Sequence, residues 1–117
     1  ILLSRIQNIL RRYKKQDQIF QYQNLQVYIS QAKVFKNHQE IFLSALEYKL
    51  LLIFVQHAHH LLTREFLLEE LYQMTGEDMN DNTLTVYIKR LRNKIEDQPQ
   101  HPQIIQTKRG LGYQLGD

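Results

Sequence analysis

TLTVYIKRLRNKI, running from Thr83 to Ile95, sets the architecture that the remaining residues have to fit. Its apolar residues recur at steps of four, three and four positions, the spacing of one buried face of an α-helix. These residues are Leu84, Ile88, Leu91 and Ile95. The stretch therefore predicts an amphipathic helix that docks on a small core through a narrow apolar stripe.

The face opposite this stripe is polar and cationic. Residues expected to point away from the core are Val86, Lys89, Arg90 and Asn93; Thr83 and Tyr87 flank one side, Thr85 and Arg92 the other, and Lys94 adds a cation near the end. A helix about 18 Å long fits a major groove about 12 Å wide, and these side chains suit phosphates, base edges and a thymine methyl. The alternative is an ordinary charged helix that faces solvent and binds nothing. Evidence from the rest of the chain is needed to distinguish the two interpretations.

Length and composition narrow the class of protein. The 117 residues suffice for one core, and 43% hydrophobic with 23% charged residues is typical of a globular domain rather than a disordered chain. The absence of cysteine excludes disulfides and fits a cytoplasmic protein. The longest apolar run, Leu50 to Val55, is far shorter than a membrane span, and we expect no membrane partner. No catalytic pair or phosphate-binding loop appears, so we expect no enzyme and no cofactor.

Positive charge is concentrated at the two ends of the chain. Residues 1–15 hold five basic and no acidic side chains, residues 16–81 four basic and nine acidic, and residues 82–117 six basic and three acidic. The net charge of +3 therefore hides two cationic ends, which are suited to an anionic partner.

The N-terminal residues predict a separate segment. Residues 1–13 have the pattern of an amphipathic helix with nothing to pack on, and 14–18 that of a polar linker. We expect the helix to be the tail of a preceding domain, in a fragment of a longer chain, with a membrane-surface helix as the alternative. Residues 19–117 form the remaining domain.

Residues 19–42, with Leu43 as a possible extension of the last strand, predict a sheet, and the region after them predicts helices. Four short aromatic and β-branched segments are separated by turns at 23–24, 30–31 and 37–38, which indicates a four-stranded antiparallel sheet. Ser44 with Glu47 is a capping box that starts a helix at Ala45, ending near the histidines of residues 57–60. Those histidines lack further ligands, so we expect no metal site. Thr63 caps a second helix from Arg64 to about Gln73.

Two connections flank the residue 83–95 helix. The acidic loop from Met74 to Asp81 predicts either a protein-contact surface or a plain connector, and Asn80 or Asn82 is expected to cap the helix that follows. After the prolines at 99 and 102, two short strands surround a basic turn with Arg109 at its tip, which predicts a hairpin suited to a narrow minor groove. The alternative is a surface hairpin that only closes the fold.

This order of a sheet, three helices and a terminal hairpin is an α+β winged helix-turn-helix. The residues 42–51 (FLSALEYKLL), 62–64 (LTR), 82–95 (NTLTVYIKRLRNKI) and 107–113 (TKRGLGY) resemble the DNA-binding domain of OmpR/PhoB-type response regulators. The resemblance covers residues 18–116, and residues 1–12 look like the last helix of the phosphoacceptor receiver domain of that family. The chain departs from the family pattern at Asn82, Thr85 and Tyr87, where many members have arginine, aspartate and histidine.

The resemblance implies a sequence-specific transcriptional regulator. In the family, the third helix enters the major groove, and the positions that match Thr83, Val86, Tyr87, Arg90 and Arg92 meet bases or phosphates. Positions matching Thr107, Gly110 and Tyr113 contact the DNA backbone, and the one matching Arg109 reaches the minor groove. The loop that matches residues 74–81, with Thr75, Glu77, Asp78 and Asn80, touches RNA polymerase. Such regulators bind direct repeats as homodimers after a histidine kinase phosphorylates the receiver. The competing hypothesis is a winged helix that docks proteins without binding DNA.

Overall fold

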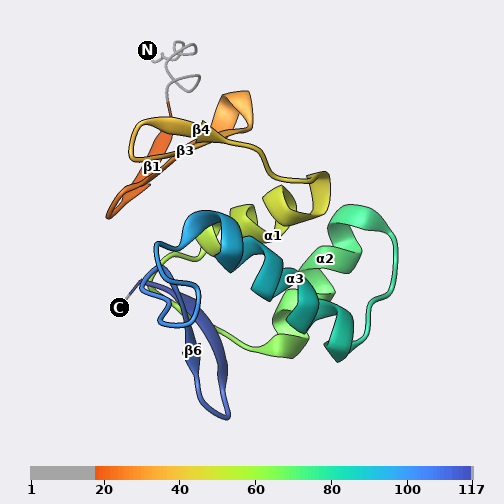
Figure 1. The fold of residues 1–117 in the computed structure, drawn as a ribbon. Coiled ribbons are helices and arrows are strands. Elements are labelled where there is room, and N and C mark those ends of the chain that lie inside the picture. The colour runs from red at the N-terminus through yellow and green to blue at the C-terminus, as the bar shows by residue number, and fades with distance from the viewer. Residues whose placement is uncertain (1–17, 117) are drawn as a thin grey trace, which may run out of the picture. The chain divides into compact units, whose positions relative to one another are not determined.

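A computed structural model describes residues 18–116, and the tail helix expected at 1–13 and most of the linker expected at 14–18 lie outside them. The described chain forms two compact units that divide after Phe42 (Figure 1). The first holds four strands and the second three helices and three strands. Within 18–116, none of the helices combines the length and the apolarity that crossing a membrane requires.

The first unit is the antiparallel sheet that the sequence predicts. Its strands are β1 (Ile19–Tyr22), β2 (Leu25–Tyr28), β3 (Lys33–Lys36) and β4 (Gln39–Ile41), paired in chain order. Leu25, Val27 and Val34 are buried on one face, because side chains alternate along a strand and Val27 pairs with Val34.

The turns of this sheet agree in place with the prediction and differ in kind. Asn37 and His38 both have positive φ, the requirement of a tight two-residue hairpin turn. The turn expected at 30–31 is instead the short 3₁₀ helix η2 (Ile29–Gln31), so Ile29 is not in a strand. The fourth strand ends at Ile41, before the expected Leu43.

The second unit is built on helices α1 (Ala45–Gln56), α2 (Arg64–Thr75) and α3 (Asp81–Ile95). Each predicted cap is present: the Ser44–Glu47 capping box is complete, Thr63 accepts from the Phe66 N–H, and Asn80 accepts from the Thr83 N–H at 2.8 Å. Helix α2 is two residues longer than expected because Gly76, with a φ of 75°, ends it in the left-handed conformation.

The three helices share one apolar core. From α1 the buried side chains are Leu50, Leu51, Ile53, Phe54 and Val55, from α2 Leu67 and Leu71, and from α3 Leu84, Ile88, Leu91 and Ile95. All four stripe residues predicted for α3 are at most 1% exposed, which confirms the docking face of this helix.

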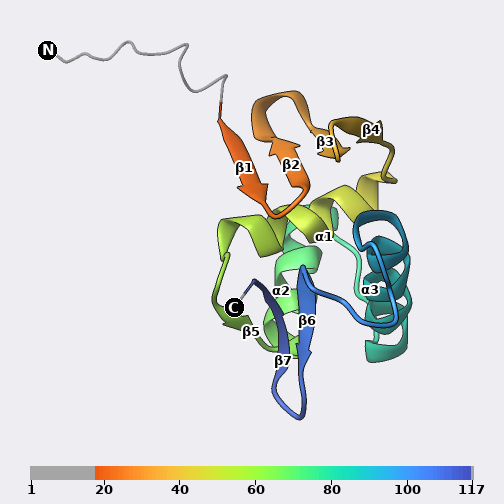
Figure 2. The ribbon, with the colours of Figure 1, turned by 60° about the vertical axis from the view of Figure 1, so that its left-hand side comes forward.

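A three-stranded sheet completes the second unit. Strands β6 (Ile105–Lys108) and β7 (Gly112–Leu115) form the expected hairpin, whose tip projects beyond the helices (Figures 1 and 2). The short strand β5 (Leu61–Leu62), not predicted from the sequence, pairs with the other edge of β7. A Cβ added at Gly112 would lie 2.1 Å from the Leu62 carbonyl oxygen, so only glycine permits this close approach.

Candidate nucleic-acid interface

Helix α3 presents the polar face that its sequence predicts. Thr85, Lys89, Arg90 and Asn93 are exposed, Thr83 and Tyr87 are partly exposed, and Val86 keeps 44% of its surface accessible. A single exposed valine is ordinary on a protein surface, and at this position Val86 is available for contact with another apolar group.

Arg90 is stacked on a neighbour within this face. Its guanidinium carbon lies 5.2 Å from the centroid of the Tyr87 ring, one helical turn earlier. A cation–π contact of this kind restricts the long side chain without using its N–H groups. The stack therefore presents Arg90 in a limited set of orientations with its donors available.

The wing carries its own cation at the tip. The loop Arg109 to Leu111 is closed by a 2.8 Å hydrogen bond from the Leu111 N–H to the Lys108 carbonyl, and Gly110 supplies the positive φ of 75°. Arg109 and Gly110 are exposed, and so is Leu111. The tip thus combines a cationic and an apolar side chain on a narrow turn.

Arg92 joins α3 to the wing. Its Nε–H donates to the Ile105 carbonyl at 3.0 Å, its Nη2 donates to Thr107 Oγ1 at 2.8 Å, and its guanidinium lies 5.5 Å from the Tyr113 ring centroid. Burial lowers the pKa of the Arg92 guanidinium, although arginine keeps its charge in proteins. Arg92 thus braces the hairpin as well as adding charge to the surface.

Arg64 makes the matching contacts from α2, a role that sequence periodicity did not reveal. Its Nη1 donates to the Tyr113 hydroxyl at 2.7 Å, and its Nη2 donates to the Asp81 carbonyl and to Thr85 Oγ1, both at 2.7 Å. Its Nε also lies 3.4 Å from Asp81 Oδ1. Tyr113, only 7% exposed, is therefore in contact with the guanidinium groups of both Arg64 and Arg92.

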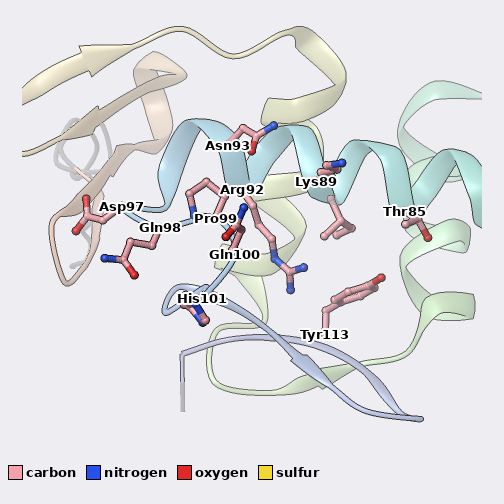
Figure 3. Close-up of a pocket in the computed structure, with 11 residues that line it drawn as sticks. Thr85, Lys89, Arg92, Asn93, Asp97, Gln98, Pro99, Gln100, His101 and Tyr113 are labelled. Atoms are coloured by element: carbon pink, nitrogen blue, oxygen red, sulfur yellow. The ribbon is translucent and has the colours of Figure 1, made fainter.

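A cleft of about 660 Å³ lies between α3, the segment that follows it and the wing. Figure 3 shows Arg92 reaching from α3 toward the hairpin, with Tyr113 below it and Thr85 further along the helix. The cleft wall also includes Lys89, Asn93 and residues 97–101. The cleft thus joins the polar face of α3 to the base of the wing.

Glu96, which the sequence pattern did not single out, fixes the return of the chain to the wing. This buried carboxylate accepts from the N–H groups of Gln103, Ile104 and Ile105 at 2.7 to 3.1 Å. The only signal in the sequence is a carboxylate directly after the last stripe residue, which is not specific.

Residues 38–115 match the family model described as the C-terminal part of transcriptional regulatory proteins. The chain belongs to the OmpR/PhoB-type response-regulator DNA-binding domains. The DNA-binding domain of RstA from Klebsiella pneumoniae, solved with the RstA box, superposes with a TM-score of 0.74 at 26% identity, over 85% of this chain and 97% of that domain.

Other relatives extend over the same region. DrrB of Thermotoga maritima, described as an OmpR/PhoB homologue, gives a TM-score of 0.77 at 29% identity over 85% of this chain and 44% of DrrB. SphR of Synechococcus elongatus, an alkaline phosphatase synthesis transcriptional regulatory protein, is 33% identical over 98% of this chain and 46% of SphR. The chain thus spans about half the length of such curated relatives.

In the structure, two sets of expected site residues have surroundings that the sequence did not show. Lys94, expected in the DNA-binding set, has its Nζ 2.8 Å from Oε1 of the buried Glu47 in α1. Position 94 is next to the stripe residue Ile95, and the sequence pattern could not show which carboxylate it would meet.

The loop between α2 and α3 is shorter than predicted. Thr75 belongs to α2, where its Oγ1 donates to the Leu71 carbonyl, and Asp81 is already in α3. The carboxamide oxygen of Asn80 is used in capping. Glu77 and Asp78 remain as the exposed acidic residues of the loop, residues 76–80.

The histidines after α1 form no metal cluster in the part of the chain that the structure describes. His57 instead packs edge-on against Phe66, with 5.1 Å between ring centroids. This contact is the role that the structure gives to His57.

Proposed function

We propose that this domain binds duplex DNA sequence-specifically, with α3 in the major groove and the β6–β7 wing in the adjacent minor groove. The observation that carries the proposal is the exposed face of α3, which Arg92 links to a hairpin with Arg109 in its turn. A helix of this width fits the major groove, and an arginine suits a narrow, electronegative minor groove. The similarity to the RstA DNA-binding domain, which was solved in complex with the RstA box, supports DNA binding by this fold.

The residues divide into three proposed roles. Thr83, Val86, Tyr87 and Arg90 read base edges; Lys89, Arg92, Thr107, Gly110 and Tyr113 lie along the backbone; Arg109 enters the minor groove. We leave Thr85 and Lys94 out of direct contact, because the Thr85 hydroxyl both accepts from Arg64 and donates to the Asp81 carbonyl, and the charge of Lys94 is paired with Glu47. Arg92 donates to uncharged partners, and the hydroxyls of Thr107 and Tyr113 each accept a hydrogen bond and keep a proton to donate.

Fluorescence anisotropy of labelled duplexes at two salt concentrations tests this function. We expect binding that weakens steeply with salt, because cations replace counterions on the phosphates. Selection from a random duplex pool should then yield a site bound at least about 10³-fold more tightly than random DNA. A winged helix that only docks proteins would show no salt-sensitive binding and would overturn the proposal.

We further propose that the whole protein is a cytoplasmic two-component regulator whose receiver is phosphorylated by a histidine kinase and which binds direct repeats as a homodimer. The selected sites should then contain two half-sites about one helical turn apart. A single half-site, selected equally well by the full-length phosphorylated protein, would contradict the dimer.

Glu77 and Asp78 are the proposed contacts to RNA polymerase, because they are the exposed acidic residues of the loop 76–80. Replacing both by lysine should reduce transcription activated in vitro while leaving the affinity for the selected duplex within about twofold, since the pair lies outside the proposed DNA contacts. Unchanged activation would contradict this contact.

A further inference from the structure

Arg64 is tied to two elements that are far apart in the sequence. From the first position of α2 it binds Asp81 and Thr85 in the first turns of α3, and Tyr113 in β7. We call Arg64, Asp81, Thr85 and Tyr113 the Arg64 cluster. The Arg64 cluster links the N-terminal half of α3, where the proposed base-reading face begins, to β7, the second strand of the wing.

Arg92 provides a second attachment further along the same helix. It binds Ile105 and Thr107 in β6, whereas Arg64 binds Tyr113 in β7. Positions 85 and 92 are about 10 Å apart along the helix axis. Two attachments at that spacing restrict the angle between α3 and the wing more tightly than either attachment would alone, in addition to the pairing of β7 with β5.

This angle matters because helix and wing are proposed to enter neighbouring grooves of one duplex. When both contacts belong to one rigid body, engaging the first places the second near its groove at no further ordering cost. If the helix and the wing move independently, binding of one element leaves the other mobile, and placing the second element in its groove then costs additional conformational entropy.

We propose that Arg64 is a positioning residue for DNA recognition, which couples the major-groove contact of α3 to the minor-groove contact of the wing. The inference rests on the DNA-binding function proposed above. Arg64 acts through Thr85, Asp81 and Tyr113 rather than through a base. Its ion pair with Asp81 is exposed, at 33% and 69% of the two side chains, so we expect its main effect on geometry rather than on folding.

A double-mutant cycle on the whole chain tests this coupling. Arg109→Ala, Arg64→Ala and the double variant are titrated with the selected duplex and with random duplex. We expect Arg64→Ala to weaken specific binding about 10- to 100-fold, and Arg109→Ala to cost at least about fivefold less in the Arg64→Ala background than in the wild type. Hydroxyl-radical protection of the minor groove under the wing should fade in Arg64→Ala.

Two conservative variants separate positioning from charge and from folding. Arg64→Lys keeps the cation but loses the planar fork, so it should not restore the coupling between the two grooves. Tyr113→Phe removes the hydroxyl that accepts from Arg64 and that is also proposed to lie along the DNA backbone. It should therefore lower the cost of Arg109→Ala as Arg64→Ala does, whereas the loss of a backbone contact alone would leave that cost unchanged. The thermal midpoint of each variant is measured alongside.

The outcomes distinguish this inference from the function on which it rests. A wild-type chain that binds no duplex would refute the proposed function itself. If the wild type binds but Arg109→Ala costs the same in both backgrounds, the positioning role is refuted. A loss in Arg64→Ala that is equal for random DNA, with full rescue by lysine, would instead make Arg64 a phosphate contact and overturn the proposal.

Discussion

Arg90 and Arg92 are two residues apart on α3 and have different surroundings. Arg90 is exposed and contacts the Tyr87 ring, whereas Arg92 is half-buried and bonded to the wing. The sequence placed both in the DNA-facing set. Only the structure separates them, because Arg92 lies at the edge of the apolar stripe and reaches residues 13 and 15 positions away.

This difference predicts distinct phenotypes for the two alanine variants. Arg90→Ala should lose about 1–3 kcal/mol of discrimination at one base pair and leave the free energy of unfolding within about 0.5 kcal/mol. Arg92→Ala should weaken binding to all duplexes, flatten the salt dependence and lower the free energy of unfolding by about 1.5–3 kcal/mol. Urea denaturation and anisotropy with single-base variants measure both effects.

Position 87 supplies a matched control for the Arg90 result. Tyr87→Phe keeps an aromatic ring under the guanidinium and should preserve discrimination at the base pair read by Arg90, whereas Tyr87→Ala should lose part of it there. Any effect of the Tyr87 hydroxyl on base reading should appear at a different base pair. Equal losses of stability in Arg90→Ala and Arg92→Ala would contradict the proposed division, in which the exposed Arg90 contacts a base and Arg92 holds the wing against α3.

At the scale of elements, α1 and α3 are joined by Glu47 and Lys94. Burial raises the pKa of the Glu47 carboxyl, but the hydrogen bonds from Lys94 and Ser44 and the charge of Lys94 outweigh it, so the folded pKa lies below the ordinary value of 4.5. The unfolded chain therefore binds the proton more readily. The contribution of this pair to the free energy of unfolding is present above about pH 4.5 and is lost as the pH falls through the folded pKa of Glu47.

Chemical denaturation between pH 6 and pH 3 checks this element-scale prediction. The wild type should lose stability more steeply over this range than Glu47→Gln, which has no carboxyl to protonate. Parallel pH profiles for the two proteins would show that Glu47 does not contribute. The comparison is needed because other carboxyl groups protonate in the same range.

The contact between β5 and β7 makes a second prediction at this scale. Gly110→Ala should lower the free energy of unfolding by about 1–2 kcal/mol, because alanine is strained at the positive φ of this position. No further cost is expected, since no atom lies within 4 Å of the added Cβ. Gly112→Ala should cost about 1–3 kcal/mol more, because its Cβ would collide with the backbone of Leu62. Thermal unfolding of both variants checks the order, and a smaller loss for Gly112→Ala would contradict the close packing of β7 on Leu62.

For the whole molecule, the sequence predicts periodic elements better than the contacts between them. The caps at Ser44, Thr63 and Asn80 and the stripe of α3 could be placed because they depend on neighbours within a few positions. Strand β5 is only two residues long, and its apolar pair has no period of its own. It forms because β7 offers it a free edge.

The candidate site follows the same division. The exposed face of α3 and the wing tip were predicted from spacing, whereas Arg64 meets Tyr113 across 49 positions and Lys94 meets Glu47 across 47. A helical period gives the face on which a residue lies, but not the partner that it finds there. The resemblance to a family predicted the order of the helices and strands, but it did not predict the Arg64–Tyr113 and Lys94–Glu47 contacts.

Glu96 also determines where this domain tolerates a change of length. Its carboxylate accepts hydrogen bonds from the backbone of residues 103–105. The start of the hairpin is therefore held in place independently of the length of the segment between Glu96 and Gln103. An insertion after the exposed Gln98 should consequently leave the strand pairing of the wing intact, although it would change the wall of the cleft beside α3.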